Sequence, residues 1–195
     1  ERDGHFVLIE EETAEDHHES SFGRMVAYHG QMGMITRALA YMMSHGTDGL
    51  KQVAEDAVLN ANYLLRSLED VLDAPFGASG PCMHEALFSD KGFAEGMTTL
   101  DLAKGLIDEG YHPMTMYFPL VVHGAMLVEP TETESREALD EFIGALRSVV
   151  ERAKAGDETL HAAPVHAPRR RLDETGAARK PILVWKEPDQ AEAAE

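Results

Sequence analysis

The clearest periodic pattern of the chain lies between residues 50 and 72, where apolar side chains recur every three or four positions. This spacing predicts an amphipathic helix with one buried face. Pro75 and Gly77 follow the pattern and predict its end. The apolar positions of the predicted helix are Leu50, Val53, Ala54, Ala57, Val58, Ala61, Leu64, Leu65, Leu68, Val71 and Leu72.

A second helical pattern runs from Phe22 to Ser44, although Gly23, Gly30 and Gly33 weaken it. Glycines in a helix indicate that another backbone or a large side chain comes close. Methionines supply an adaptable apolar surface on the same helix, at Met25, Met32, Met34, Met42 and Met43. We expect this helix to pack within a larger body, to be partly exposed in the chain alone, and to mediate self-association.

Two further helices are predicted downstream. Thr98 or Thr99 is placed to cap the first, and Gly110 closes it. The second starts near Thr133 and ends at Gly156. The expected core positions of the two helices are Leu102, Ala103, Leu106, Ile107, Leu139, Phe142, Ile143, Leu146, Val149 and Val150.

Short apolar runs between the helices predict strands at 6–9, 83–89, 114–118 and 125–129. The last two form a hairpin whose turn we place at 121–124. Proline cannot donate to a strand ladder, so Pro130 ends the second hairpin strand. Thr131 and Glu134 then have the spacing of a capping box for the last helix.

The predicted order is strand, helix, helix, strand, helix, hairpin, helix. This order indicates an α+β domain in which a small, largely antiparallel sheet is covered by helices on one face. We divide the chain into an N-terminal strand and acidic loop (1–21), the domain itself (22–156), an extended basic arm (157–186) and a disordered tail (187–195).

The arm carries the densest basic run of the chain, comprising Arg169, Arg170, Arg171, Arg179 and Lys180. One interpretation is that Pro168–Trp185 docks on its own domain, with Trp185, Ile182 and Val184 as the buried anchor and the arginines setting its path. A disordered tail is the alternative, because hydrophobicity is low up to Pro181.

Charge and composition narrow the class of partner. The chain has 17 basic and 35 acidic residues and a net charge of −18, which disfavours nucleic acid and anionic membrane surfaces. Cys82, the single cysteine, cannot form an internal disulfide, which fits a reducing compartment. No apolar run has the length of a membrane span. The chain starts at Glu1 with neither methionine nor signal peptide, which suggests a piece of something longer.

Candidate chemistry is sparse. Ten histidines raise the possibility of a metal site, yet no pair has the i, i+4 spacing on a firm helix, and Cys82-x-His84 lacks a second half. No phosphate-binding glycine loop or nucleophile elbow is present. Glu132 and Glu134 are explained by a helix start, where the dipole favours negative charge. The residues alone predict an accessory domain without a catalytic or metal centre; a free-standing binding module and a His-rich metal-binding protein stay open.

Five stretches together resemble one known family. They are VLNANYLL (58–65), CMHEALFS (82–89), LDLAKGLIDEGYHPMTMYFPL (100–120), VEPTETESREALDEF (128–142) and APRRRLDETGAARKPILVW (167–185). They resemble the C-terminal part of glycine dehydrogenase (decarboxylating), the P-protein of the glycine cleavage system, which is the second subunit in split enzymes. The likeness runs from about Phe22 to Trp185, with local departures at His29, Gln31 and Met114.

The resemblance implies the small C-terminal domain of a pyridoxal-phosphate (PLP) enzyme of the aspartate-aminotransferase-like fold, fold type I. In that family glycine is decarboxylated on the cofactor, and the aminomethyl group passes to the lipoyl arm of the H-protein. Expected partners are therefore the missing large domain, the partner subunit, the H-protein and glycine. The implied location is the bacterial cytoplasm, or the mitochondrial matrix in a eukaryote.

The family's cofactor lysine lies in a His-Lys-Thr motif before a glycine-rich stretch, and that motif is absent here. None of the six lysines has this context, namely Lys51, Lys91, Lys104, Lys154, Lys180 and Lys186. We therefore expect no catalytic or cofactor-binding residue in this chain, no PLP bound to it, and no activity of the chain alone. Because the family's matching segments face the active-site mouth, the resemblance implies four residues near substrate or the lipoyl arm: His112, Thr115, Thr131 and Glu132.

Overall fold

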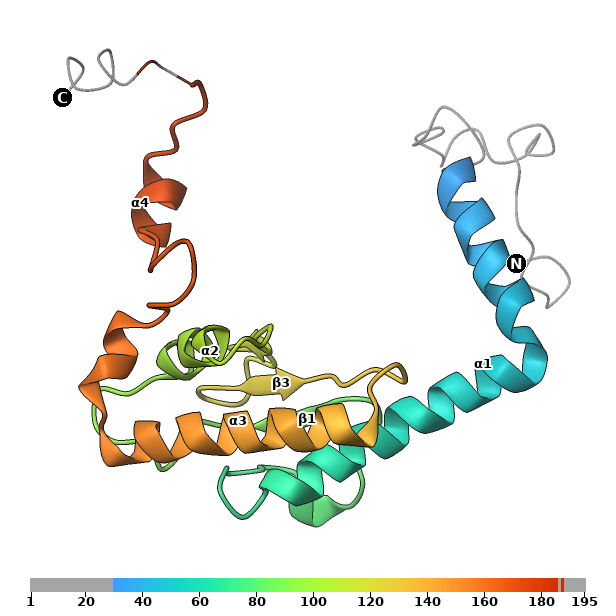
Figure 1. The fold of residues 1–195 in the computed structure, drawn as a ribbon, viewed down its shortest axis with the longest axis horizontal. Helices are drawn as coiled ribbons and strands as arrows, with labels where there is room; N and C mark the ends of the chain where they lie inside the picture. Colours follow the sequence, from blue (N-terminus) through green and yellow to red (C-terminus); the bar gives the residue numbers. More distant parts are fainter. Residues whose placement is uncertain (1–29, 186, 188–195) are drawn as a thin grey trace, which may run out of the picture. The chain divides into compact units, whose positions relative to one another are not determined.

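The computed structural model describes residues 30–185 and residue 187. The chain divides into two compact units, residues 1–50 and 51–195. The helix α1 (Met32–Leu68) contributes to both, and it is interrupted at Gly46, whose φ of 63° and ψ of −174° are not helical. This break lies between the two helices predicted for this region (Figure 1). The predicted strand at 6–9, the acidic loop and the tail from residue 188 lie outside the described residues.

In the first unit, the described helical residues expose nearly all of their side chains. The expectation that the methionine-bearing helix is partly exposed is therefore confirmed for residues 30–44. Tyr41 and His45 stack one turn apart, with ring centroids 4.2 Å apart. The large apolar side chains exposed here are Met32, Met34, Ile35, Leu39, Tyr41, Met42, Met43 and Leu50.

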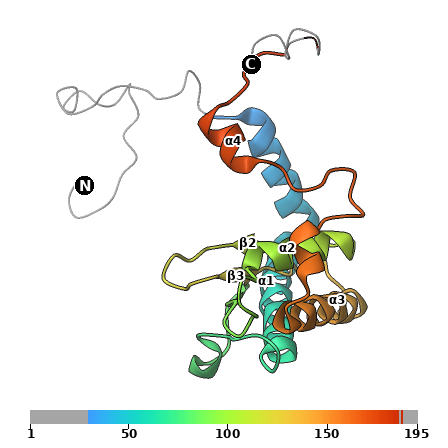
Figure 2. The same cartoon turned by 90° about the vertical axis from the view of Figure 1, so that its left-hand side faces the viewer.

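The second unit is built around a three-stranded antiparallel sheet, which confirms the α+β prediction. Its strands are β1 (Ala86–Phe88), β2 (Thr115–Met116) and β3 (Met126–Val128), in the order β1-β3-β2. Figure 2 shows β2 and β3 with α2 close by. In β1 and β3 the first and last residues are buried and the middle one is half-buried, so one face of the sheet forms the core.

Three helices supply the other side of that core: the end of α1, α2 (Thr99–Asp108) and α3 (Arg136–Ala155). Most of the predicted helical positions are buried or half-buried, because their spacing places them on one face, whereas Leu50, Ala54 and Val58 are exposed. The core cluster includes Leu64, Leu65, Leu68, Phe88, Leu102, Leu106, Met126, Ile143, Leu146, Val149, Val150 and Leu160. None of the described helices has the length and apolarity that a bilayer crossing requires.

The helix α2 begins with the predicted threonine cap. Thr98 accepts a hydrogen bond from the backbone N–H of Asp101, and the Asp101 carboxylate accepts one from the backbone N–H of Thr98 at 2.9 Å. This reciprocal arrangement is a capping box. The helix ends at Asp108, close to Gly110, which was predicted to close it.

The hairpin is shorter and its connection longer than predicted. The predicted turn at 121–124 lies within a longer connection, because β2 ends at Met116 and β3 begins only at Met126. Pairing persists one residue further, since the backbone N–H of Tyr117 donates to the carbonyl of Ala125 at 2.8 Å. Pro119 has no N–H to donate, which prevents the ladder from continuing.

The capping box predicted for the last helix is wrong. α3 starts at Arg136 and is capped by Ser135, whose hydroxyl accepts from the backbone N–H of Ala138 at 3.2 Å. Thr131 and Glu134 instead close a turn, in which the Glu134 N–H donates to the Thr131 carbonyl at 3.3 Å. The end of α3 is as predicted, because Gly156 adopts the left-handed conformation with φ of 71°.

The basic arm is not uniformly extended. It contains a short 3-10 helix, η3 (Glu158–Ala162), and the helix α4 (Glu174–Arg179). Arg171 fixes it to the domain, because its guanidinium donates to the Asp101 carboxylate at 2.7 Å. The same guanidinium donates to the carbonyls of Leu160 and Ala163, within the arm, at 2.8 Å each. The arm therefore contacts its own domain at Arg171.

The predicted hydrophobic anchor of the arm is wrong. Ile182 is 89% exposed, Val184 69% and Trp185 80%, so none of them is buried against the described residues. A buried carboxylate holds the arm in their place. The Asp101 side chain is 3% exposed, and a charge-assisted hydrogen bond in such a setting is much stronger than a surface ion pair.

We predict that Arg171→Ala releases the arm. The change leaves the Asp101 carboxylate buried without its guanidinium partner, which should lower the free energy of unfolding by about 1–3 kcal/mol. Urea unfolding measures the loss, and limited proteolysis with thermolysin should cut between residues 163 and 172. Arg169→Ala is the matched control, because Arg169 is exposed. Equal stability and equal cleavage of both variants would contradict this role of Arg171.

We also predict that the arm loosens in acid. Burial opposes ionisation of Asp101, but hydrogen bonds from Thr98, Arg171 and His161 outweigh it and hold the pKa of Asp101 below its ordinary value of 3.8. A carboxyl whose pKa is lowered on folding stabilises the folded state above its unfolded pKa, and this contribution disappears as the pH falls through the folded value. Proteolysis of the arm by an acid-active protease should therefore rise only below about pH 4. A rise already between pH 7 and 5 would argue against Asp101 as the titrating group.

Candidate functional site

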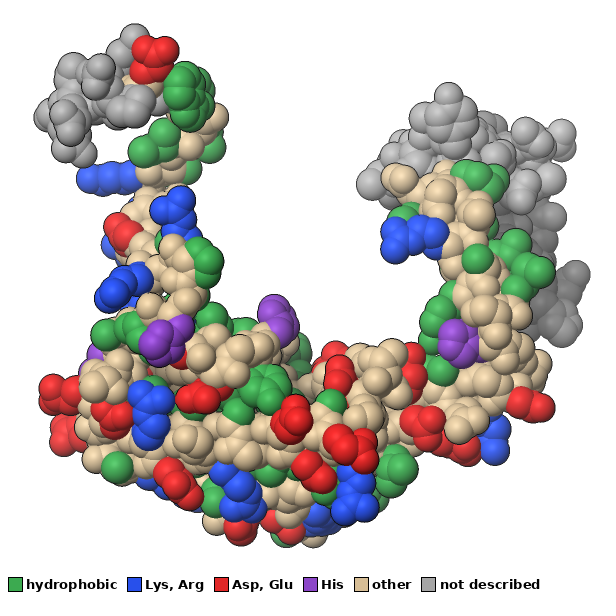
Figure 3. Space-filling view, viewed as in Figure 1, with side chains coloured by type: hydrophobic (Ala, Val, Ile, Leu, Met, Phe, Trp, Pro, Cys, Tyr) green, Lys and Arg blue, Asp and Glu red, His purple; other side chains and the backbone are tan. Residues whose placement is uncertain are grey.

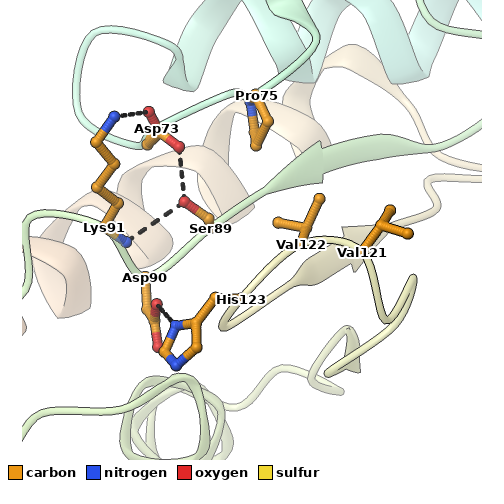
Figure 4. Close-up of a pocket in the computed structure, with 8 residues that line it drawn as sticks. All are labelled: Asp73, Pro75, Ser89, Asp90, Lys91, Val121, Val122 and His123. Atoms are coloured by element: carbon orange, nitrogen blue, oxygen red, sulfur yellow. Dashed lines mark hydrogen bonds and ion pairs between the residues drawn. The ribbon is translucent and has the colours of Figure 1, made fainter.

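Polar side chains gather at both ends of the three-stranded sheet. At the end where β1 stops, the Ser89 hydroxyl donates to the Asp73 carboxylate at 2.7 Å, and the Lys91 ammonium lies 3.3 Å from the same carboxylate (Figure 4). The Ser89 hydrogen bond, followed by Lys91, lowers the pKa of Asp73 despite partial burial. The Asp73 carboxylate is therefore ionised and already paired.

At the same end of the sheet, Asp90 contacts the part of the β2–β3 connection that leads into β3. Its carboxylate lies 3.3 Å from Nδ1 of His123 (Figure 4). Thr99 donates to the carbonyl of Gly124 at 2.7 Å. Gly124 has a φ of 58°, and a Cβ at this position would collide with the Asp90 carboxylate. Only glycine combines this backbone conformation with this close approach.

These groups line an open groove. Pro75, Val121 and Val122 form its apolar side, and Asp73, Ser89, Asp90, Lys91 and His123 form its polar side. The polar groups are largely paired with one another, and the His123 side chain is 96% exposed. The groove can therefore receive a polar or charged group, but it offers no pair of nucleophile and base.

The second polar cluster lies where β3 ends and β1 begins. The Asn60 amide of α1 donates to the backbone carbonyls of Thr131 and Glu134, at 2.9 and 3.2 Å. Asn62, two residues later, donates to the carbonyl of Cys82 at 2.7 Å and accepts from the Cys82 backbone N–H at 2.9 Å. Three stretches that the family resemblance singled out thus converge on one place.

His84, Glu85 and Glu129 form the one group among the described residues whose side chains are close enough to share a metal ion. Their ligand atoms lie within 4.8 Å of one another, and β1–β3 register places Glu85 opposite Glu129. His84 and Glu129 are exposed, however, and the set lacks the fourth protein ligand of a structural zinc site. We assign no metal to it.

The structure separates the four predicted site residues into two pairs. Thr131 and Glu132 lie in the turn that Asn60 holds, and the Thr131 and Thr133 hydroxyls lie 2.7 Å apart. Thr115 lies on β2, opposite Leu127, and His112 is exposed in the segment that enters β2. None of the four lines the groove of Figure 4.

Sequence reasoning missed the residues that hold these segments. Asn60 and Asn62 are amides within an otherwise apolar helical stretch, although asparagine is a poor helix former. Their presence there was the sequence signal that these side chains have partners outside the helix. The burial of Cys82, which raises the pKa of its thiol, marks it as a packed side chain with little thiolate at neutral pH.

The chain was compared with known families and curated relatives. Residues 53–167 match the family described as glycine dehydrogenase, C-terminal domain. The chain is 64% identical over 180 residues to a probable glycine dehydrogenase (decarboxylating) subunit 2 of Caulobacter vibrioides, covering 91% of this chain and 34% of that protein. It is 51% identical to the protein of the same description from Shouchella clausii, covering 85% and 34%. The chain thus spans about a third of the length of these relatives.

A solved structure supports the fold. The chain is similar to glycine decarboxylase (P-protein) of the glycine cleavage system in inhibitor-bound form, with a TM-score of 0.53 and 22% sequence identity. The superposition covers 65% of this chain and 28% of that one. At this identity the similarity establishes the architecture of the domain.

We predict that Gly124→Ala destabilises the domain. The added Cβ meets the Asp90 carboxylate, and the left-handed backbone is strained for alanine, so the free energy of unfolding should fall by about 2–4 kcal/mol. Gly144→Ala is the matched control: Gly144 is an exposed position within α3 with open space around it, and alanine should stabilise it by about 0.5–1 kcal/mol. Urea unfolding measures both, and an equal shift of both midpoints would show that Asp90 does not constrain the loop.

Proposed function

Because the chain belongs to the family of glycine dehydrogenase C-terminal domains, we propose that it acts as the C-terminal part of subunit 2 of a split glycine dehydrogenase (decarboxylating). The observation that carries this proposal is the family match over residues 53–167, which contains every buried apolar residue among those described, from Ala61 to Ala163. The matched segment therefore contains the hydrophobic core of the described residues.

The proposed reaction is the decarboxylation of glycine with pyridoxal phosphate, followed by transfer of the aminomethyl group to the lipoyl arm of the H-protein. Pyridoxal phosphate supplies an electron sink that makes loss of CO2 feasible when it is bound. Since the chain spans about a third of its relatives, the rest of subunit 2 and subunit 1 must supply the remaining machinery.

The described residues do not fit a binding site for this cofactor. A cofactor lysine needs a desolvated or electropositive setting that lowers its pKa. Lys51 and Lys91 are 75% and 80% exposed and are paired with Glu55 and Asp73. Lys104 lies 3.8 Å from Glu174, and Lys154 and Lys180 are exposed. We therefore route no chemical step through this chain.

The proposed role of this chain is to position segments near the reaction. The two amide hydrogen bonds from Asn60 fix the turn that carries Thr131 and Glu132. A fixed turn can hold hydroxyl and carboxylate groups toward a substrate or a lipoyl arm without the entropic cost of ordering them at each turnover. Thr115, on β2, and His112, in the segment that enters β2, are proposed to lie near the same substrate or lipoyl arm.

We predict that this chain alone forms no specific adduct with pyridoxal phosphate. Mixing it with the cofactor and reducing with borohydride should label several lysines partially, because Lys51, Lys91, Lys154 and Lys180 are all exposed and none is set apart from the others. Subunit 2 in full, together with subunit 1, should give one stoichiometric adduct and glycine-dependent exchange of CO2. Stoichiometric labelling of a single lysine of this chain, together with glycine-dependent CO2 release, would overturn the proposal.

A further inference from the structure

Apolar exposure is distributed unevenly along the chain. Residues 53–167 contain every buried large apolar side chain of the described residues, although they also expose some, such as Met83, Leu120 and Val121. Every large apolar side chain described outside this range is exposed, on both sides of it. After residue 167 these are Leu172, Ile182, Leu183, Val184 and Trp185. What distinguishes the described flanks is that none of their large apolar side chains is buried in this chain.

The base of the C-terminal flank is firmly attached. Asp108, at the end of α2, accepts the backbone N–H groups of Val165 and His166 at 2.7–2.8 Å. Arg171 is held by Asp101, as described above. The segment that follows is therefore displayed from a fixed point.

The displayed segment is basic in an acidic chain. Arg169, Arg170, Arg179 and Lys180 form no ion pair with a carboxylate of the described residues. Residues 168–185 contain five basic and two acidic residues, a net charge of +3, which leaves −21 on the rest of the chain. Figure 3 shows basic and hydrophobic side chains together over α4 and the residues after it.

We propose that Leu172–Trp185 is a docking strap, which binds the part of subunit 2 that lies outside this chain. The proposal rests on the proposed function, since it takes the chain to be a third of that subunit. The surface that receives the strap is an apolar groove with an acidic rim. The groove accommodates Ile182–Trp185, and the rim pairs with Arg179 and Lys180.

Two arguments favour this occupant over a second copy of the chain. A partner on the same polypeptide has a high effective concentration, in the millimolar range for short connections. A second copy would instead bring together two chains with a net charge of −18 each, which repel. Residues 30–50 support the same conclusion, because they are the described part of the other flank and also expose large apolar side chains.

The test uses full-length subunit 2 with and without subunit 1, carrying the photo-crosslinking amino acid p-benzoylphenylalanine in place of Trp185. Crosslinks within one polypeptide, to peptides that precede this chain, are expected in both preparations. Ser148, exposed on α3, is the control position for the same substitution. Crosslinks to subunit 1 or to a second copy, or a yield at position 185 no higher than at 148, would overturn the proposal.

A charge reversal tests the rim. Arg179→Glu combined with Lys180→Glu should lower the crosslinking yield from position 185 several-fold, whereas Lys154→Glu, on α3, should leave it unchanged. Equal yields in both variants would refute an acidic rim. Glycine-dependent CO2 exchange, measured on the same preparations without the probe, separates the two proposals: its absence counts against the enzyme assignment, while the crosslinks still report on docking.

Discussion

The buried carboxylate of Asp101 is the constraint on which the organisation of the second unit depends. It closes the capping box that starts α2, and the same carboxylate receives Arg171 and lies 3.1 Å from Nδ1 of His161. Burial makes an unpaired charge costly, so the three partners must be present together in the folded state. One side chain thereby couples the start of a core helix to a segment seventy residues further along the chain, which hydrophobic burial alone does not hold.

The sequence predicted those features of the fold that depend on residues close together in the chain, namely apolar spacing and helix caps. Apolar spacing identified the helices because a period of 3.6 residues leaves one face for the core. The adjacent threonines Thr98 and Thr99 located the start of α2 to within one residue, because either can cap a helix. The predicted start of α3 was wrong because Thr131 and Ser135 can both cap a helix, and sequence spacing does not decide between them. Asn60 decides between them by binding the carbonyls of residues 131 and 134, a contact across more than seventy residues.

The candidate site was less predictable for the same reason. The family resemblance pointed to Thr131 and Glu132, whereas the side chains that position them lie on another helix and carry no periodic signal. The arm shows the opposite error. Its apolar end predicted burial, yet Trp185 is exposed among the described residues. The contact that attaches the arm is made by Arg171, one of several arginines in a basic run. Composition specifies which groups need partners, but it leaves open which partner is within reach.

A self-contained core with uncovered flanks implies a division of labour between stability and assembly. The buried residues between Ala61 and Ala163 stabilise the domain, so substitutions there act through folding. The exposed apolar side chains on either flank contribute little to that core, and they become stabilising only when another surface removes them from water. Evolution can therefore alter the flanks to match a changing partner without unfolding the domain, provided that Asp101 continues to fix the point from which the C-terminal flank departs.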